Sequence, residues 1–144
     1  AQIVFMPMQY PEDVKAAKKI VAKMKQPACV LKEDFTTREL MSLVGNMDLM
    51  IGIRLHALIF AGVMGTPMIG ISYDPKIDRF LKSIDEDVVG DLENVTVEAL
   101  MQEINAKWNN KEIYRNQNLK RMAKLRSLAR SNAEMALEFI DKNK

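Results

Sequence analysis

The chain has 144 residues, of which 48% are hydrophobic and 28% charged, enough for one globular domain with a core. Six Gly and five Pro exclude a collagen-like polymer, and no apolar run approaches the roughly 20 residues of a membrane-spanning helix. One cysteine, Cys29, and one histidine exclude an internal disulfide and a His/Cys metal cluster, so we expect no bound metal. The apolar neighbours of Cys29 predict an inert thiol in a buried strand.

The net charge of +2 conceals two segments of opposite sign. Residues 1–106 hold 11 Lys or Arg against 15 Asp or Glu, and residues 107–144 hold 10 against 4. Such a basic segment is typical of a solvated helix face or of a surface that meets an anionic partner. The chain opens at Ala1 directly into a strand pattern, without an initiator Met or a charged leader, so we expect a piece of a longer chain.

The first elements in chain order are a strand over 3–6 and a helix that starts at Pro11 and ends before Pro27. A second strand covers 28–31. Thr36 and Glu39 then have the spacing of a capping box, which predicts a short helix that stops at residues 45–46.

The remaining pattern predicts a strand at 49–53, a helix at 55–64, a strand at 68–73 and a helix at 77–83. A short edge strand at 88–90 precedes a helix over 97–107, for which Thr96 is the expected N-cap. Apolar positions at helical spacing then predict one long amphipathic helix over about 112–141, with its basic residues largely on the outer face.

Strands that alternate with helices and are apolar throughout indicate a parallel sheet covered on both faces. We therefore predict a single Rossmann-like α/β domain over residues 1–144. Ligands in such sheets bind at the carboxyl ends of the strands. The glycines fit neither a dinucleotide fingerprint nor a phosphate-binding P-loop, and no nucleophile elbow is present.

Two stretches stand at the expected carboxyl edge. The strand at 49–53 runs into Arg54 and His56, and the strand at 68–73 runs into Asp74 and Lys76. If the two strands are adjacent, Arg54, His56 and Lys76 converge beside helix N-termini, where they would hold a phosphate or carboxylate. Structural roles stay open at this point: Arg54 could pair with Asp48 or Asp74, and His56 and Lys76 could be ordinary structural and surface residues.

Residues 47–61 (MDLMIGIRLHALIFA) and 65–76 (GTPMIGISYDPK) closely resemble the polysaccharide pyruvyltransferase family, most of all its CsaB-type branch. Both elements occur in order, and Pro7, Met8, Gln9 and Asp13 resemble the family's first strand-to-helix turn. The resemblance covers about thirty residues closely, and the rest of the chain agrees in pattern only.

The resemblance implies the C-terminal half of a GT-B-like two-domain enzyme that transfers pyruvate from phosphoenolpyruvate to a cell-wall sugar as a ketal, for S-layer anchoring. It implies His56 as the catalytic residue, Arg54 and Lys76 as donor-binding residues, and Ser72, Tyr73 and Asp74 as further substrate-binding positions. It requires no cofactor beyond the donor substrate, and it implies that residues of an N-terminal half are needed for activity.

Two other functions stay open. A nucleotide-sugar-binding half of a glycosyltransferase or epimerase would need a carboxylate for the ribose, for which only residues 85–87 and Asp91 are available. A non-catalytic module would use its basic terminal helix, but it lacks the interleaved aromatics of single-strand binders. We expect a cytoplasmic enzyme whose basic helix docks on the N-terminal half or on the inner face of an anionic membrane, and not on nucleic acid.

Overall fold

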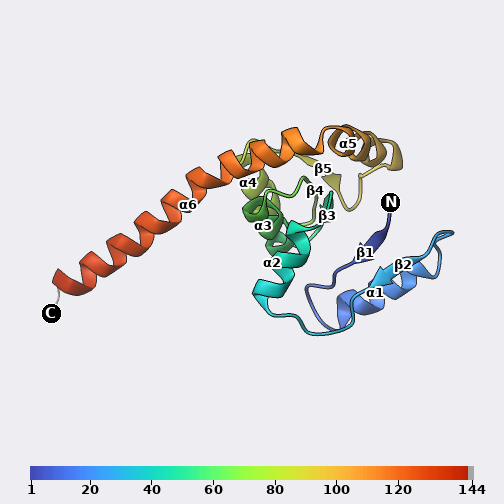
Figure 1. The fold of residues 1–144 in the computed structure, drawn as a ribbon, viewed down its shortest axis with the longest axis horizontal. Helices are drawn as coiled ribbons and strands as arrows, with labels where there is room; N and C mark the ends of the chain where they lie inside the picture. The colour runs from blue at the N-terminus through green and yellow to red at the C-terminus, as the bar shows by residue number, and fades with distance from the viewer. Residues whose placement is uncertain (143–144) are drawn as a thin grey trace. The chain divides into compact units, whose positions relative to one another are not determined.

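The structure is a computed structural model that describes residues 1–142, and it divides into two compact units, Ala1–Glu39 and the chain from Leu40 onward. All strand pairs of the described residues are parallel and are flanked by helices, which confirms the predicted α/β class with Rossmann-like parallel sheets. The strands form two sheets, one in each unit (Figure 1). The single-domain organisation expected for residues 1–144 stays a prediction.

Unit 1 is a small βαβ arrangement in which β1 and β2 pair in parallel. Its helix carries two acidic residues in the first turn, next to the positive end of the helix dipole, and buries Val14 and Ala17. It packs against β2. The elements are β1 (Ile3–Phe5), α1 (Glu12–Val21) and β2 (Ala28–Val30).

The expectation for Cys29 was wrong, because its side chain is exposed. Ala28 and Val30 are half-buried, whereas Cys29 between them points to the other face, as the period of two along a strand requires. In unit 1 the strand has one partner, β1, and one covering helix, α1, so its second face stays open within this unit. An apolar run predicts a strand but does not say how many of its faces are covered.

Unit 2 is built on a three-stranded parallel sheet of order β3-β4-β5. The central strand, β4, is buried at four of its five positions, and helices α3 and α4 both pack on it. Helix α5 contacts β4 and β5, and α6 packs against α3. Helix α2 (Thr37–Gly45) leads into this unit, whose further elements are β3 (Met50–Gly52), α3 (Leu55–Met64), β4 (Met68–Ser72), α4 (Pro75–Ser83), β5 (Val88–Asp91), α5 (Val97–Asn109) and α6 (Lys111–Lys142).

Several local signals of the sequence fix the helix ends. Thr36 and Glu39 form the predicted capping box, in which the Thr36 backbone N–H donates to Glu39 Oε2 at 2.7 Å. The predicted N-cap Thr96 accepts from the Ala99 backbone N–H at 3.2 Å. Gly65 ends α3 in the left-handed region, with a φ of 75° that a residue without a Cβ adopts at little cost.

Helix α6 forms over Lys111–Lys142, close to the predicted 112–141. Its first half packs on unit 2, where Asn118 and Met122 are buried. From residue 126 onward every described residue is exposed, and the helix continues beyond the rest of the unit without packing on it (Figure 1). The predicted apolar stripe therefore meets the core only in its first part. No helix in the described residues is both long and apolar enough to cross a membrane.

Candidate functional site

The turns after β3 and β4 have the same construction. The two strands are adjacent and parallel, with Gly52 in register with Gly70, so both turns lie at the carboxyl edge of the sheet. Two residues after each strand comes a helix N-cap, Arg54 for α3 and Asp74 for α4, in extended backbone. Two residues further, in the first turn of each helix, stand His56 and Lys76.

This construction places the predicted site residues at one edge of the sheet. Arg54 and Asp74 are half-buried, whereas His56, Tyr73 and Lys76 are exposed. His56 therefore lies outside the core, and the positive ends of two helix dipoles lie at the same edge. The arrangement can attract an anion and can offer it both a fixed charge and a titratable imidazole.

Lys76 is held by its own turn. Its ammonium forms an ion pair with Asp74 at 3.3 Å and lies 5.6 Å from the centre of the Tyr73 ring. The Lys76 backbone N–H donates to Asp74 Oδ1 at 2.9 Å, which caps α4 and lowers the pKa of Asp74. The hydrogen bond and charge of Asp74 in turn raise the pKa of Lys76, so the lysine stays a cation.

Ser72 is buried, and its hydroxyl donates to Asp78 Oδ2 at 2.5 Å. Asp78 belongs to the first turn of α4, four residues after the N-cap. The hydroxyl thus ties the end of β4 to the helix that carries Lys76. Sequence reasoning named Ser72 as a substrate-binding residue and missed Asp78, whose signal was its place as an acidic residue in a helix first turn.

The first strand-to-helix turn of unit 1 is closed by a carboxylate. Asp13 Oδ2 accepts from the backbone N–H groups of Met8 at 3.1 Å and Gln9 at 3.0 Å. These are the residues that carried the family resemblance in unit 1, and the hydrogen bonds give Asp13 a structural role in shaping that turn.

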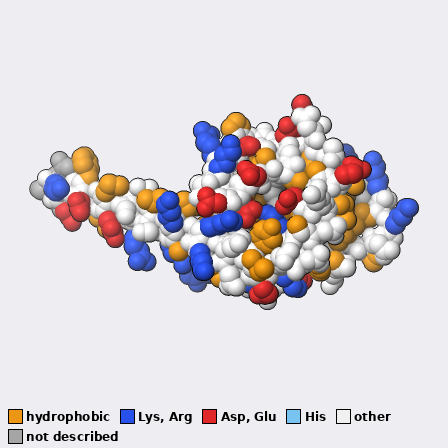
Figure 2. Space-filling model, turned by 90° about the horizontal axis from the view of Figure 1, so that it is seen from above, with side chains coloured by type: hydrophobic (Ala, Val, Ile, Leu, Met, Phe, Trp, Pro, Cys, Tyr) orange, Lys and Arg blue, Asp and Glu red, His pale blue; other side chains and the backbone are white. Residues whose placement is uncertain are grey.

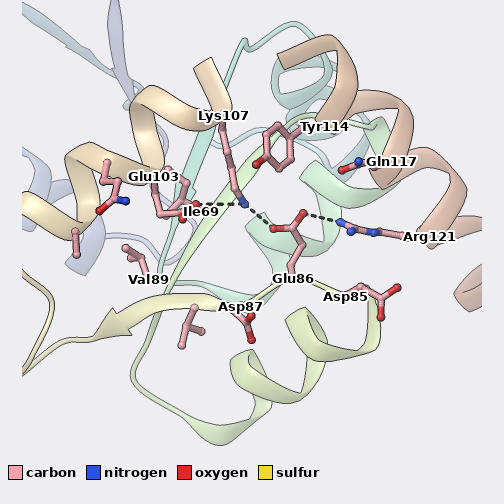
Figure 3. A pocket seen from close by; sticks show the side chains of 13 residues that line it. Ile69, Asp85, Glu86, Asp87, Val89, Glu103, Lys107, Tyr114, Gln117 and Arg121 are labelled. Carbon is pink, nitrogen blue, oxygen red and sulfur yellow. Dashed lines mark hydrogen bonds and ion pairs between the residues drawn. The ribbon is translucent and has the colours of Figure 1, made fainter. Parts of the chain in front are cut away.

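A cavity of about 520 Å³ lies at the opposite, amino edge of the sheet of unit 2 (Figure 3). It contains a buried ionic cluster in which Glu86 pairs with Lys107 at 2.5 Å and with Arg121 at 2.7 Å. Lys107 also donates to the Met68 carbonyl at 2.7 Å, at the start of β4. Figure 3 shows Lys107 and Arg121 reaching the carboxylate from α5 and α6.

This cluster bears on the nucleotide-sugar alternative. The acidic residues 85–87 precede β5 and so lie at the amino edge, away from a ligand at the carboxyl ends of the strands. Asp91, at the end of β5, accepts from the Asn94 side chain and from the backbone N–H groups of Asn94 and Glu93, and these hydrogen bonds lower its pKa. Glu86 and Asp91 are therefore engaged in structure, and Asp85 and Asp87 lie at the edge away from such a ligand.

Among the described residues, no group of three or more His, Cys, Asp and Glu side chains has the arrangement to hold a metal ion.

The family model of the polysaccharide pyruvyl transferases matches residues 1–75, which is more than half of the chain. The chain belongs to the polysaccharide pyruvyl transferase family. The match spans β1 to β4 and includes Arg54, His56 and Asp74. Lys76 is the residue that directly follows the matched segment. No curated protein and no solved structure matches the chain significantly.

Proposed function

We propose that this chain supplies the donor site of a pyruvyl transferase that uses phosphoenolpyruvate and forms a ketal on a polysaccharide sugar. The observation that carries the proposal is the matched pair of turns after β3 and β4, which bring Arg54, His56 and Lys76 to one edge. Phosphoenolpyruvate carries a phosphate and a carboxylate, and a helix N-terminus with Arg and Lys suits both groups.

In this proposal His56 is the general acid. It donates a proton to the methylene carbon of phosphoenolpyruvate, which becomes a methyl group while positive charge develops at the neighbouring carbon. A sugar hydroxyl attacks that carbon, phosphate leaves, and a second hydroxyl closes the ketal. Of the two hydroxyl protons released, one restores His56 and the other leaves with the phosphate.

In the same proposal Lys76 and Arg54 bind the two negatively charged groups of the donor. The Lys76 ammonium, kept protonated by Asp74, is a point charge for the phosphate, and the planar guanidinium of Arg54 suits the carboxylate. Both charges stabilise the donor and the leaving phosphate, so their loss weakens donor binding more than proton transfer. Ser72, Tyr73 and Asp74 shape this side of the site and hold Lys76 in place.

The finer identity is part of the same proposal. The close resemblance of residues 47–61 and 65–76 supports a CsaB-type enzyme that acts on a cell-wall glycan in the cytoplasm, as the C-terminal half of a GT-B-like protein. In the proposed enzyme the acceptor is a lipid-linked sugar, and residues of the N-terminal half supply the rest of the site.

The test compares His56→Ala and Lys76→Ala in the complete enzyme, with ketal formation and phosphate release measured against phosphoenolpyruvate concentration. We expect His56→Ala to reduce kcat by about 100-fold or more, and Lys76→Ala to act mainly on KM. Lys82→Ala, an exposed lysine in the last turn of the same helix, is the matched control and should leave both constants unchanged. Equal turnover of parent and His56→Ala at saturating donor would remove His56 from the chemistry.

A binding experiment separates the donor from a nucleotide. In calorimetric titration the parent should bind phosphoenolpyruvate, and Lys76→Ala should bind it at least about tenfold more weakly, the loss of one charge-assisted contact. Binding of uridine diphosphate in place of phosphoenolpyruvate would contradict the proposal and favour the nucleotide-sugar alternative.

A further inference from the structure

Ser72 and Asp78 close the turn between β4 and α4. Ser72 is the last residue of β4 and is buried, and its hydroxyl donates to Asp78 Oδ2 at 2.5 Å. The same hydroxyl oxygen lies 3.5 Å from the Asp74 carbonyl, which is too far for a second strong hydrogen bond. The one proton of the hydroxyl therefore serves Asp78, and Ser72 is joined to α4 rather than open to a ligand.

The backbone at the start of α4 has little left for an anion. Pro75 has no N–H, and the Lys76 N–H donates to Asp74 Oδ1 at 2.9 Å. The Ile77 N–H donates to the Asp74 carbonyl at 2.9 Å. Over the face that Figure 2 shows, basic side chains are interspersed with acidic ones, so an anion meets single cations rather than one broad basic surface. The Lys76 ammonium is then the group of this turn that can hold a phosphate, and its position matters.

Two side chains anchor the first turn of α4 and set its rotation. Successive residues of a helix are about 100° apart, so Ile77 and Asp78 lie about 100° and 200° around the axis from Lys76. Ile77 is 0% exposed in the core of unit 2, and Asp78 accepts from Ser72. With both side chains held, Lys76 lies on the outer side of the helix, which agrees with its exposed position.

We propose that Asp78 is a positioning residue of the donor site, which through its hydrogen bond with Ser72 fixes the rotation of α4 and so the place of the Lys76 ammonium. The inference rests on the proposed donor site. Without Asp78 the first turn of α4 loses one of its two side-chain anchors, and the ammonium is spread over more positions. Binding of the donor then has to order the ammonium, which weakens binding.

The charge of Asp78 makes the inference testable by the sign of an effect. A carboxylate near the site repels a phosphate, so removal of its charge alone would tighten donor binding. Loss of its hydrogen bond acts in the other direction. Asp78→Asn removes the charge and keeps an acceptor oxygen, whereas Asp78→Ala removes both, so the two variants separate the effect of charge from that of position.

The test measures the binding of phosphoenolpyruvate to the complete enzyme by calorimetric titration. We expect Asp78→Ala to weaken donor binding by about fivefold to tenfold, the equivalent of one hydrogen bond, although it removes a negative charge. Asp78→Asn should bind the donor as well as the parent or more tightly. Ser72→Ala should match Asp78→Ala, and the double variant should be no weaker than either single one, because all three lack the same hydrogen bond.

Two further measurements ask whether the effect passes through Lys76. In a chain that already carries Lys76→Ala, the change Asp78→Ala should weaken donor binding no further. In steady-state kinetics, Asp78→Ala should raise KM for the donor and leave kcat nearly unchanged, because His56 stands on α3 and is not held by this hydrogen bond. Asp87→Ala, which removes an exposed carboxylate at the amino edge, is the control for net charge and should leave both constants unchanged.

The outcomes separate this inference from the proposed function. Donor binding that Lys76→Ala does not weaken would overturn the donor site, and the inference with it. If Lys76→Ala weakens binding while Ser72→Ala and Asp78→Ala do not, the donor site stands and the inference is wrong. Tighter binding by Asp78→Ala, or a further loss from it in the Lys76→Ala chain, also overturns the inference. Far-UV circular dichroism checks folding, and where Ser72→Ala does not fold, the comparison of Asp78→Ala with Asp78→Asn decides.

Discussion

Glu86 is the position at which unit 2 should be most sensitive to a single isosteric change. The carboxylate is 8% exposed and neutralises two cations, Lys107 at 4% exposure and the partly buried Arg121. Glu86→Gln keeps the volume of the side chain but removes its charge, which leaves the Lys107 ammonium buried with the Met68 carbonyl and a distant Glu103 at 4.0 Å. Removal of one partner of a buried ion pair costs about 3–5 kcal/mol.

We expect Glu86→Gln to lower the free energy of unfolding by about 3 kcal/mol, the lower end of that range because Arg121 can reach water. Lys107→Met should cost less, about 2 kcal/mol, because Glu86 keeps Arg121 and the loss is one hydrogen bond to each of two acceptors. The double variant should cost less than the sum of the two, since no unpaired ammonium remains.

The assay is urea denaturation followed by the fluorescence of Trp108, the single tryptophan, which adjoins Lys107 on α5 and so reports on unit 2. Far-UV circular dichroism gives a second probe for two-state behaviour. The reasoning is refuted if Glu86→Gln unfolds within about 1 kcal/mol of the parent, or if Lys107→Met proves the more damaging change.

Three further changes test the fold. Gly70→Ala should cost about 1–3 kcal/mol in urea denaturation, because its Cβ would stand 2.4 Å from Leu81 Cδ1 in the buried central strand; an unchanged midpoint would show that Leu81 moves freely. Thr96→Ala should cost about 1 kcal/mol by loss of the cap on Ala99 N–H, and Thr96→Ser, which keeps the hydroxyl, should be nearly neutral in the same measurement. Because the pKa of Asp74 is lowered in the folded state, this carboxylate contributes stability that is present above about pH 4 and is lost as the pH falls through its folded-state pKa. Asp74→Asn should therefore flatten the acid limb of a profile of unfolding free energy against pH. An identical acid limb in the parent and the variant would contradict this assignment.

Local patterns predicted the helices and the strands well, because the signals that define them are short-range. The helix over 55–64 was placed at its observed bounds, since the run of small and apolar residues ends at Gly65 and a tight turn follows. The edge that carries Arg54, His56 and Lys76 followed from one rule about parallel strands. The hydrogen bond from Ser72 to Asp78, which ties β4 to α4 beside this edge, was not predictable, because it depends on side-chain directions rather than on sequence spacing.

The ion pairs between residues far apart in the chain could not be predicted from the sequence. Glu86 and Lys107 are 21 residues apart, and each stands in a segment that is polar enough to suggest solvent. Only the fold shows that α5 and α6 bring two cations to the same carboxylate. The misplaced Cys29 has the related cause that burial of a strand face depends on elements elsewhere in the chain.

The cluster around Glu86 also sets an order of events during synthesis. The sheet strands and α4 leave the ribosome first. Glu86 has neither of its cationic partners until Lys107 and Arg121 are synthesised, 21 and 35 residues after it. Until those residues emerge, closure of the amino edge would bury a carboxylate without a counter-charge, and the chain gains more by leaving that edge open to water. The nascent chain should thus remain protease-sensitive around residues 84–90 until α6 has begun to form. The Asp74 turn, in which Asp74 binds Lys76 two residues further on, can be complete well before.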